Sequence, residues 1–305
     1  MTMRIGVDLG GTKIEAAALD SKANVISRQR IATPQTEYAD TLDAIAGLVS
    51  TVEADIGATV PKIGVGTPGS LSPASGLIRN ANSTRLNGQK LDKDLADRLG
   101  RPVRLANDAN CFALAEAMSG AGQDADTVFG VILGTGVGAG VVVDGNVLLG
   151  RNHIAGEWGH NPLPLPRPDE IPGPLCYCGR YGCIETWCSG PGLAADHQRE
   201  TGIEASPADI VMLAKAGDMS AQDTLDRHLS RLARAMAGVV NILDPDVIVL
   251  GGGLSNLDHL LTDLGPAMTP HVFSDTFRTP IRQNQLGDSA GVIGAAWLWP
   301  SEGAS

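Results

Sequence analysis

Apolar runs alternate with polar turns along the chain, and one order of elements occurs twice. Strands are predicted at 4–9, 14–19 and 25–31 in the first half, and at 128–133, 139–143 and 147–149 in the second. In both halves a glycine turn with a threonine follows the first strand, and a turn with Asp or Asn follows the second. This recurrence predicts two homologous halves whose glycine turns face each other across a cleft.

Between these repeats, apolar residues recur at helical spacing and alternate with short buried strands. The spacing predicts helices at 39–54, 92–99, 109–118, 207–214, 220–240 and 290–298. Further strands are predicted at 63–66, 103–106, 247–250 and 281–285. We therefore expect an α/β protein, with the last helix folding back onto the first half.

Composition narrows the class of protein. A chain of 305 residues can hold one large domain or two of moderate size. Its net charge of −11 argues against a nucleic-acid surface, which needs clustered Lys and Arg. The first strand begins almost at once and no apolar run reaches the ~18 residues of a membrane span, so we expect neither leader nor membrane anchor. Five cysteines, an odd number, indicate a reduced cytoplasmic protein.

Two glycine turns could hold an anion through backbone N–H groups, although an ordinary hairpin explains each one alone. They are Gly10-Gly11-Thr12-Lys13 and Gly134-Thr135-Gly136-Val137-Gly138. No helix follows the second turn, which disfavours a dinucleotide fingerprint, and no P-loop motif is present. The triple glycine Gly251-Gly252-Gly253 follows a buried strand and would let a flat group such as a nucleoside approach the backbone.

Polar residues stand at two other places where a ligand could bind. Asn107 and Asp108 lie where a strand gives way to a helix, so they are equally explained as a helix cap and as catalytic groups. The segment with Asn80 and Asn82 is irregular; its asparagines suit turns, and they also suit recognition of hydroxyls.

One histidine and three of the five cysteines have the spacing of a metal site. His160, Cys176, Cys178 and Cys183 would supply the four ligands of a structural zinc, which we favour over a chance group of reduced cysteines. Cys111 and Cys188 lie outside this spacing and are predicted to be core residues. Glu157 and Glu185 flank the cluster, so the same ion would fix them where they can accept sugar hydroxyls. The second nitrogen of His160 would stay available for a substrate.

In this order, these motifs resemble those of the ROK family of sugar kinases along essentially the whole chain. The resemblance is strongest to bacterial fructokinases of the manno(fructo)kinase type, in the segments 80–84, 105–111 and 241–245. It implies an actin-like (ribonuclease-H-like) fold of two duplicated α/β lobes, with ATP in the cleft between them. The smaller lobe would hold 1–118 together with 288–305, and the larger lobe 119–287. Mg²⁺ and a homodimer are also implied.

The resemblance also implies roles for particular residues. Asp108 would be the general base, and Asp8 would lie near the metal. Asn107, Glu157, His160 and Glu185 would hold the sugar together with Asp108, and Asn80 or Asn82 would join them. The ATP site would comprise Gly10, Gly11, Thr12 and Lys13 with Gly134, Thr135 and Gly136 at the phosphates, and Gly251, Gly252 and Gly253 at the adenosine.

The expected reaction is phosphorylation of the 6-hydroxyl of fructose. Glucose, mannose or an N-acetylhexosamine is the alternative within the same chemistry, because discrimination between sugars depends on the exact placement of side chains. The proline-rich insert 162–174 is longer than in glucokinase-type members, which argues against transferring glucokinase specificity to this chain. A non-catalytic sugar sensor is the alternative of another class. The intact Asp108 and the expected lack of a DNA-binding helix pair argue against it.

Overall fold

The computed structural model describes residues 3–81 and 83–300, and the chain forms two compact units. The first unit contains the chain up to Asp126, the segment Gly140–Ala155 and the chain from Gln285 on. The second contains Thr127–Ala139 and Gly156–Asn284. The division expected from the resemblance kept 140–155 in the larger lobe. The structure differs because Gly140 packs directly on the backbone of Ala109 and Asn110, so that this segment belongs with the first unit.

The first sheet has the strand order β3-β2-β1-β4-β7. Its strands are β1 (Arg4–Leu9), β2 (Lys13–Leu19), β3 (Val25–Ala32), β4 (Ile63–Thr67) and β7 (Val103–Asn107). Strands β1, β2 and β3 form an antiparallel meander, and β4 and β7 are added in parallel to β1. The carboxyl ends of β1, β4 and β7 therefore meet at one edge of the sheet.

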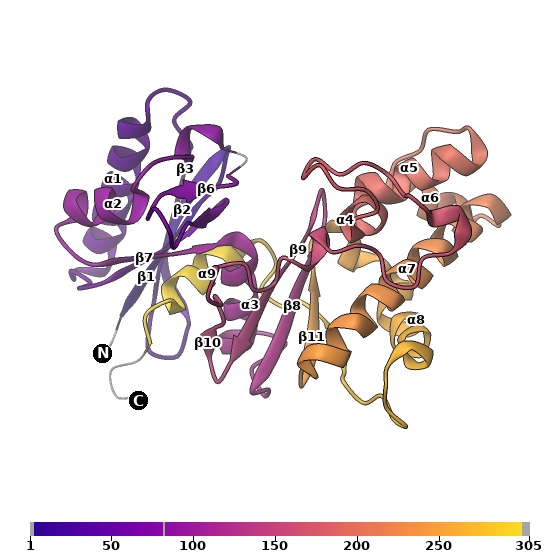
Figure 1. Ribbon diagram of the computed structural model, residues 1–305. Helices are drawn as coiled ribbons and strands as arrows, with labels where there is room; N and C mark the ends of the chain where they lie inside the picture. The colour runs from indigo at the N-terminus through magenta and orange to yellow at the C-terminus, as the bar shows by residue number, and fades with distance from the viewer. Residues whose placement is uncertain (1–2, 82, 301–305) are drawn as a thin grey trace. The chain divides into compact units, whose positions relative to one another are not determined.

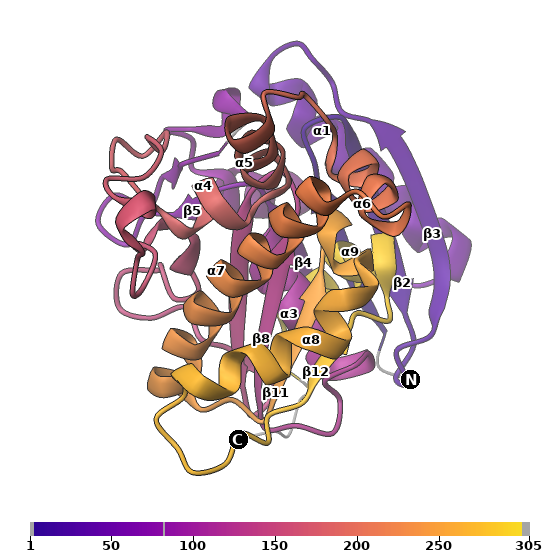
Figure 2. The ribbon, with the colours of Figure 1, turned by 90° about the vertical axis from the view of Figure 1, so that its right-hand side faces the viewer.

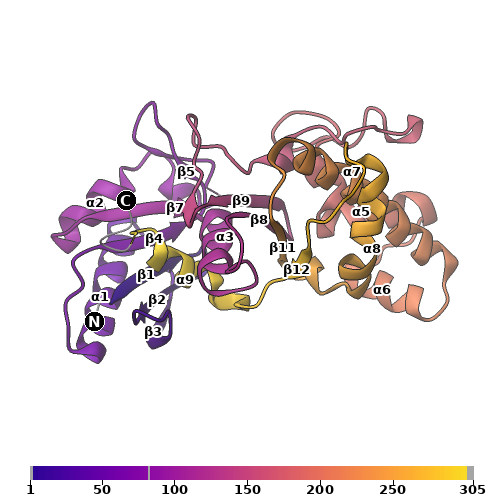
Figure 3. The same cartoon turned by 90° about the horizontal axis from the view of Figure 1, so that it is seen from below.

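Helices cover the first sheet. α1 (Tyr38–Ile56) and α2 (Leu91–Leu99) lie side by side, and α1 packs on β2 and β3 (Figure 1). α9 (Ala290–Trp297) packs on β1 and β4 and against α3 (Asp108–Ser119), as Figure 3 shows. Gly6 and Gly64 make this close packing possible, because a Cβ at either position would overlap the backbone of α9. The predicted return of the last helix to the first half is confirmed.

The second sheet repeats the design of the first, with the order β10-β9-β8-β11-β12. Its strands are β8 (Thr127–Leu133), β9 (Val137–Val143), β10 (Asn146–Val147), β11 (Val247–Gly251) and β12 (Ile281–Gln283). Strand β11 pairs in parallel with β8 and β12, as β4 does with β1 and β7. The predicted duplication is therefore confirmed at the level of strand order.

The second unit is rich in helices. They are α4 (Ile184–Cys188), α5 (Gly190–Thr201), α6 (Pro207–Lys215), α7 (Met219–Leu243) and α8 (Asp258–Met268). The long helix α7 contacts all of the others, with α8 alongside it (Figure 2). Helices α4, α5 and α8 were not predicted. No helix in the described part of the chain is long and apolar enough to cross a membrane.

Short elements complete the structure. The two-residue strands β5 (Ser70–Leu71) and β6 (Ile78–Arg79) form a small hairpin, and six 3₁₀ turns lie at Thr84–Leu86, Trp158–His160, Pro168–Glu170, Gly253–Asn256, Thr269–His271 and Gly287–Ser289. The proline-rich insert holds only one of these turns, so it is not a helix. Its Glu170 is buried and accepts hydrogen bonds at 2.8 Å from Arg231 and Arg234 of α7. These buried ion pairs hold the proline-rich insert against α7.

Candidate functional site

In the first unit, two carboxylates lie at the edge where the parallel strands end. Asp8 is near the end of β1, and Asp108 follows β7 as the first residue of α3. Asn107 caps this helix, because its side-chain oxygen accepts the N–H of Asn110 at 2.8 Å. The Asp108 carboxylate accepts the N–H of Ala109 at 2.8 Å. The cap role of Asn107 is thus observed, and Asp108 is left beside it with an exposed side chain.

The charges of these two carboxylates influence each other. Desolvation of its carboxylate by the surrounding protein raises the pKa of Asp108 above its usual value. The pKa of Asp8 is raised to about 6, first by burial and then by the negative charges of Asp108 and Glu15, although Lys13 opposes the shift. Carboxylates that share a site hold a proton or a cation more readily than isolated ones. Their oxygens are also the ligands that Mg²⁺ prefers, so the donor set fits this ion.

The first glycine turn joins β1 to β2 and is held by its own residues and two side chains. The Gly10 N–H donates to the Lys13 carbonyl at 2.9 Å. Thr33 donates to the Gly10 carbonyl at 2.8 Å, and Gln35 donates to the Gly11 carbonyl at 3.1 Å. These bonds fix the turn while Gly11 and Thr12 remain exposed.

Of the two candidate asparagines, the structure describes only Asn80. Asn80 is exposed and has a left-handed backbone with φ of 58°, which Asn tolerates better than most residues. Asn82 lies outside the described residues. The assignment of either side chain to a ligand stays a prediction.

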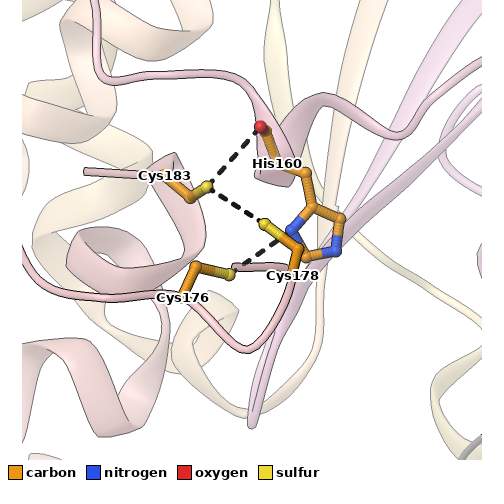
Figure 4. Close-up of side chains that lie close together, drawn as sticks. All are labelled: His160, Cys176, Cys178 and Cys183. Carbon is orange, nitrogen blue, oxygen red and sulfur yellow. Dashed lines mark hydrogen bonds between the residues drawn. The ribbon is translucent and has the colours of Figure 1, made fainter. Parts of the chain in front are cut away.

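In the second unit, the four predicted metal ligands come together (Figure 4). Their ligand atoms all lie within 4.8 Å of one another. Nδ1 of His160 is 3.6 Å from Sγ of Cys176, and the sulfurs of Cys178 and Cys183 are 3.6 Å apart. Ligands at the usual zinc distances in a tetrahedron are separated by about 3.5–3.8 Å. The geometry therefore fits a zinc ion.

The electrostatics of this His/Cys cluster also favour a cation. Hydrogen bonds from Arg180 lower the pKa of the Cys178 thiol to about 6. Burial, followed by the hydrogen bond with Cys178, raises the pKa of Cys183 to about 12. Three thiolates in this space require a positive ion. Gly179 and Gly182 have positive φ angles of 84° and 67° and permit the tight turn that carries the cysteines.

Tyr177 is a member of this site that the sequence analysis missed. Its hydroxyl lies 2.9 Å from Nε2 of His160, and the two rings meet edge to face. With Nδ1 of His160 directed at the cluster, Nε2 is the nitrogen that remains for a ligand. The Tyr177 side chain is 84% exposed, so a ligand can displace its hydroxyl.

Val137, within the second glycine turn, connects that turn to the His/Cys cluster. Its N–H donates to Oε2 of Glu185 at 2.9 Å. Its carbonyl packs against Gly159, where any Cβ would overlap it. A Cβ at Gly136 would lie 2.7 Å from the same Glu185 oxygen. One oxygen of Glu185 is thus engaged in holding the turn, while Glu157 is exposed at the start of the His160 turn.

A cavity of about 750 Å³ opens beside the second glycine turn. The Gly134 carbonyl accepts the N–H of Gly190, the first residue of α5, at 2.8 Å. Gly252 has a φ of 80° and packs on Leu133 so closely that a Cβ would overlap it. The wall comprises Gly134, Thr135, Gly190, Pro191, Ala194, Ser206, Pro207, Ala208, Val211, Gly253, Leu254, Asn256 and Leu257. The structure thus brings the second glycine turn and the triple glycine together at one cavity. The sequence signal for α5 was the cap Ser189 with a proline in the first turn.

The duplicated α/β fold, the paired carboxylates and the His/Cys cluster define a class of protein, and the comparisons with known proteins agree. The model of the ROK family matches residues 4–302, so the chain belongs to the ROK family. It is 38% identical over 300 residues to the N-acetyl-D-glucosamine kinase of Vibrio cholerae, covering 97% of this chain and 99% of that protein.

Two solved structures show the same architecture. The ROK hexokinase from Thermus thermophilus matches with a TM-score of 0.87 and 32% identity, over 97% of both chains. A ROK family glucokinase from Streptomyces griseus, in complex with glucose and AMPPNP, matches with a TM-score of 0.74 and 29% identity, over 96% of this chain and 98% of that one. These matches confirm the actin-like fold that the sequence motifs implied.

Proposed function

We propose that this protein is an ATP-dependent kinase of N-acetylglucosamine that transfers the γ-phosphate to the 6-hydroxyl of the sugar. The observation that carries the proposal is the match to N-acetyl-D-glucosamine kinases, at 38% identity over almost the full length of both proteins. The two solved relatives named above are a hexokinase and a glucokinase bound to a sugar and an ATP analogue, which supports sugar phosphorylation in general.

This proposal replaces the fructose specificity expected from the sequence motifs. The curated relatives are N-acetylglucosamine kinases and not fructokinases, so they favour the N-acetylhexosamine alternative. The motifs that suggested fructose, such as the strand-to-helix segment with Asn107 and Asp108, build the catalytic end of the site. These motifs do not distinguish a sugar that carries a hydroxyl group from one that carries an acetamido group in its place.

Asp108 takes the proton from the attacking hydroxyl in this mechanism. Its carboxylate lies at the start of α3, and its raised pKa makes it a better base than an ordinary aspartate. Phosphoryl transfer depends mainly on positioning and on neutralising charge. Mg²⁺, when bound with ATP, supplies charge neutralisation, and Asp8 is the carboxylate that would hold it. Lys13 and the N–H groups of the two glycine turns would face the phosphates.

The sugar and the nucleoside use other groups. Asn107, Glu157, His160 and Glu185 hydrogen-bond the sugar, with Nε2 of His160 released by Tyr177. The adenosine occupies the cavity beside Gly134 and the triple glycine. The His/Cys cluster would fill all four positions of a bound zinc ion, so such an ion would orient His160 and Glu185 and would activate no water. The homodimer implied by the family resemblance remains part of the proposal.

Replacement of the base tests this mechanism. Asp108→Asn should fold and bind N-acetylglucosamine, yet turn over at least ~100-fold more slowly, because amide oxygen is a poor proton acceptor. Asp97→Asn, on the exposed face of α2, is the matched control and should keep wild-type turnover. ADP release is measured with Mg-ATP and the sugar. Near-normal turnover of Asp108→Asn would remove this residue from the role of base.

The same assay separates the kinase from a sugar sensor. A wild-type protein that binds N-acetylglucosamine but releases no ADP with any hexose would be a sensor. We expect release of one ADP for each sugar phosphate formed.

A further inference from the structure

The cavity beside the second glycine turn has a wall that is unusual for a site that must recognise a base. We propose that it accepts the base of the phosphate donor by shape alone, so that ATP, ITP and GTP serve as nearly equivalent donors. This inference rests on the proposed function, and it concerns which nucleotides the site admits.

Most of the wall is apolar. Three elements contribute to it: α5, α6 and the 3₁₀ turn Gly253–Asn256 with the residue after it. Pro191, Ala194, Pro207, Val211, Leu254 and Leu257 form the main apolar surface. None of the residues that line the cavity is charged. Such a surface binds the faces of a purine ring, and the side chains that form it offer the edge of the ring no hydrogen-bonding partner.

Two of the three polar side chains of the wall, those of Ser206 and Asn256, make hydrogen bonds within the protein. Ser206 caps α6: its hydroxyl donates to the Asp209 carboxylate at 2.6 Å and accepts the Asp209 N–H at 3.2 Å. The Asn256 amide oxygen accepts from Gln283 at 3.0 Å, and its amide nitrogen donates to the Gly253 carbonyl at 3.4 Å. Thr135 belongs to the glycine turn, which we assign to the phosphates.

This arrangement sets a limit on base discrimination. ATP, ITP and GTP differ only at the edge of the purine, in the amino and oxo groups and in the proton on N1. A site rejects a wrong edge by factors of ~10⁴ or more only when it is built to hydrogen-bond the right one, whereas an apolar pocket discriminates far less. We therefore expect the dissociation constants of the three nucleotides to agree within about tenfold.

Direct binding tests this inference independently of turnover. The dissociation constants of Mg-ATP, Mg-ITP and Mg-GTP are measured by calorimetry on the full chain, and kcat/KM with N-acetylglucosamine is measured beside them. Values within tenfold of one another support the inference. A preference for ATP above tenfold overturns it. Failure of ATP to phosphorylate any sugar would count against the proposed kinase function and would leave the binding comparison valid.

A matched pair of variants tests whether this cavity is the base site. Ala194→Leu places a larger side chain in the cavity and should weaken all three nucleotides in parallel, by at least ~10-fold. Ala195→Leu makes the same change one residue along α5, where the side chain is exposed and does not line the cavity. It should bind all three nucleotides like the wild type. Unchanged binding by Ala194→Leu would place the base elsewhere and overturn the inference.

Discussion

Val137 gives the second glycine turn its fixed relation to the His/Cys cluster. Its N–H binds Glu185, and its carbonyl packs on Gly159 next to His160. The residues proposed to hold the sugar and the turn proposed to hold phosphate are therefore joined through the backbone of one residue, Val137. A substitution in the turn should therefore change the affinity for the sugar, even where the new side chain touches no sugar atom.

Gly136→Ala tests this coupling. The new Cβ would lie 2.7 Å from Oε2 of Glu185, so the carboxylate or the turn must move. Such displacement costs about 1–3 kcal/mol, and we expect the dissociation constant for N-acetylglucosamine to rise about tenfold without nucleotide present. Gly134→Ala is the comparison, because its Cβ would meet no atom within 4 Å; it should keep the affinity for the sugar. Equal sugar affinity in both variants would contradict the coupling.

The role of a single residue could be predicted from the sequence where that role depends only on residues nearby in the chain. The grouping of the four predicted metal ligands and the strand-to-helix switch at Asn107 and Asp108 depend on spacing within a short stretch. The structure brings the four side chains together and begins α3 at Asp108, one residue before the predicted helix. Tyr177 and the contact of Val137 with Glu185 were missed. A tyrosine between two cysteines carries no signal of the histidine it will meet, and the Glu185 contact joins segments 48 residues apart.

Among the elements, the loop of the His/Cys cluster is the one whose order depends most on a bound ion. It carries little regular structure apart from 3₁₀ turns and isolated bridges at Pro162 with Cys183 and at Leu175 with Tyr181. A few backbone hydrogen bonds, such as that from the Leu163 N–H to the Gly182 carbonyl, hold the loop, and we expect the four ligands to add the main link between His160 and the cysteines. Without zinc, we expect His160 and Glu185 to lose their fixed positions.

Removal of one ligand tests this dependence. The purified protein should contain about one zinc per chain, and Cys178→Ser should lose both the zinc and most of the affinity for the sugar. Cys188→Ala removes a buried thiol outside the cluster and should keep the metal. Zinc is measured by elemental analysis and sugar binding by calorimetry. A wild-type protein without zinc would refute the assignment.

Helices were predicted where apolar spacing was regular, as in α1 and α7, and missed where glycine or proline obscured it. α5 begins with Gly190-Pro191-Gly192, which is typical of a loop. α8 buries Leu260, Leu264 and Met268 at a spacing of four, yet Pro266 lies inside it. In both cases tertiary packing on α7 outweighs the local preference.

For the molecule as a whole, the duplication was predicted, whereas the order of the strands within each sheet and the division of the chain come from the structure. Repeated patterns at the two glycine turns are local and visible in the sequence, so the duplicated sheets could be predicted. The assignment of Gly140–Ala155 to the first unit depends on packing against α3, which no local pattern reveals.

The pH dependence of global stability has an identifiable contributor in α7. His228 is buried, with Nε2 3.1 Å from the Cys188 carbonyl, and burial lowers its pKa to about 4. The hydrogen bond with the Cys188 carbonyl and the charge of Asp196 oppose this lowering of the pKa, and His259 and Arg231 add to it. The unfolded chain, with a pKa near 6.5, binds the proton more readily. The contribution of neutral, buried His228 to the free energy of unfolding is therefore fully present above about pH 6.5. It is lost as the pH falls towards 4, by up to ~3 kcal/mol.

Urea unfolding at pH 7.5 and pH 5 measures this effect. The loss of stability between the two should be smaller in His228→Gln than in the wild type, whereas His271→Gln, at a partly exposed histidine, should retain the full loss. An identical pH dependence in all three proteins would show that His228 does not carry it.

The ranking of sugars by kcat/KM with saturating Mg-ATP tests the central claim most directly. N-acetylglucosamine, fructose, glucose and mannose are compared in one ADP-release assay. The account predicts that N-acetylglucosamine exceeds each of the others by about 100-fold or more, since a site built to hydrogen-bond the acetamido group loses that contact with the other sugars. A higher kcat/KM for fructose would contradict the proposed specificity and restore the fructokinase interpretation.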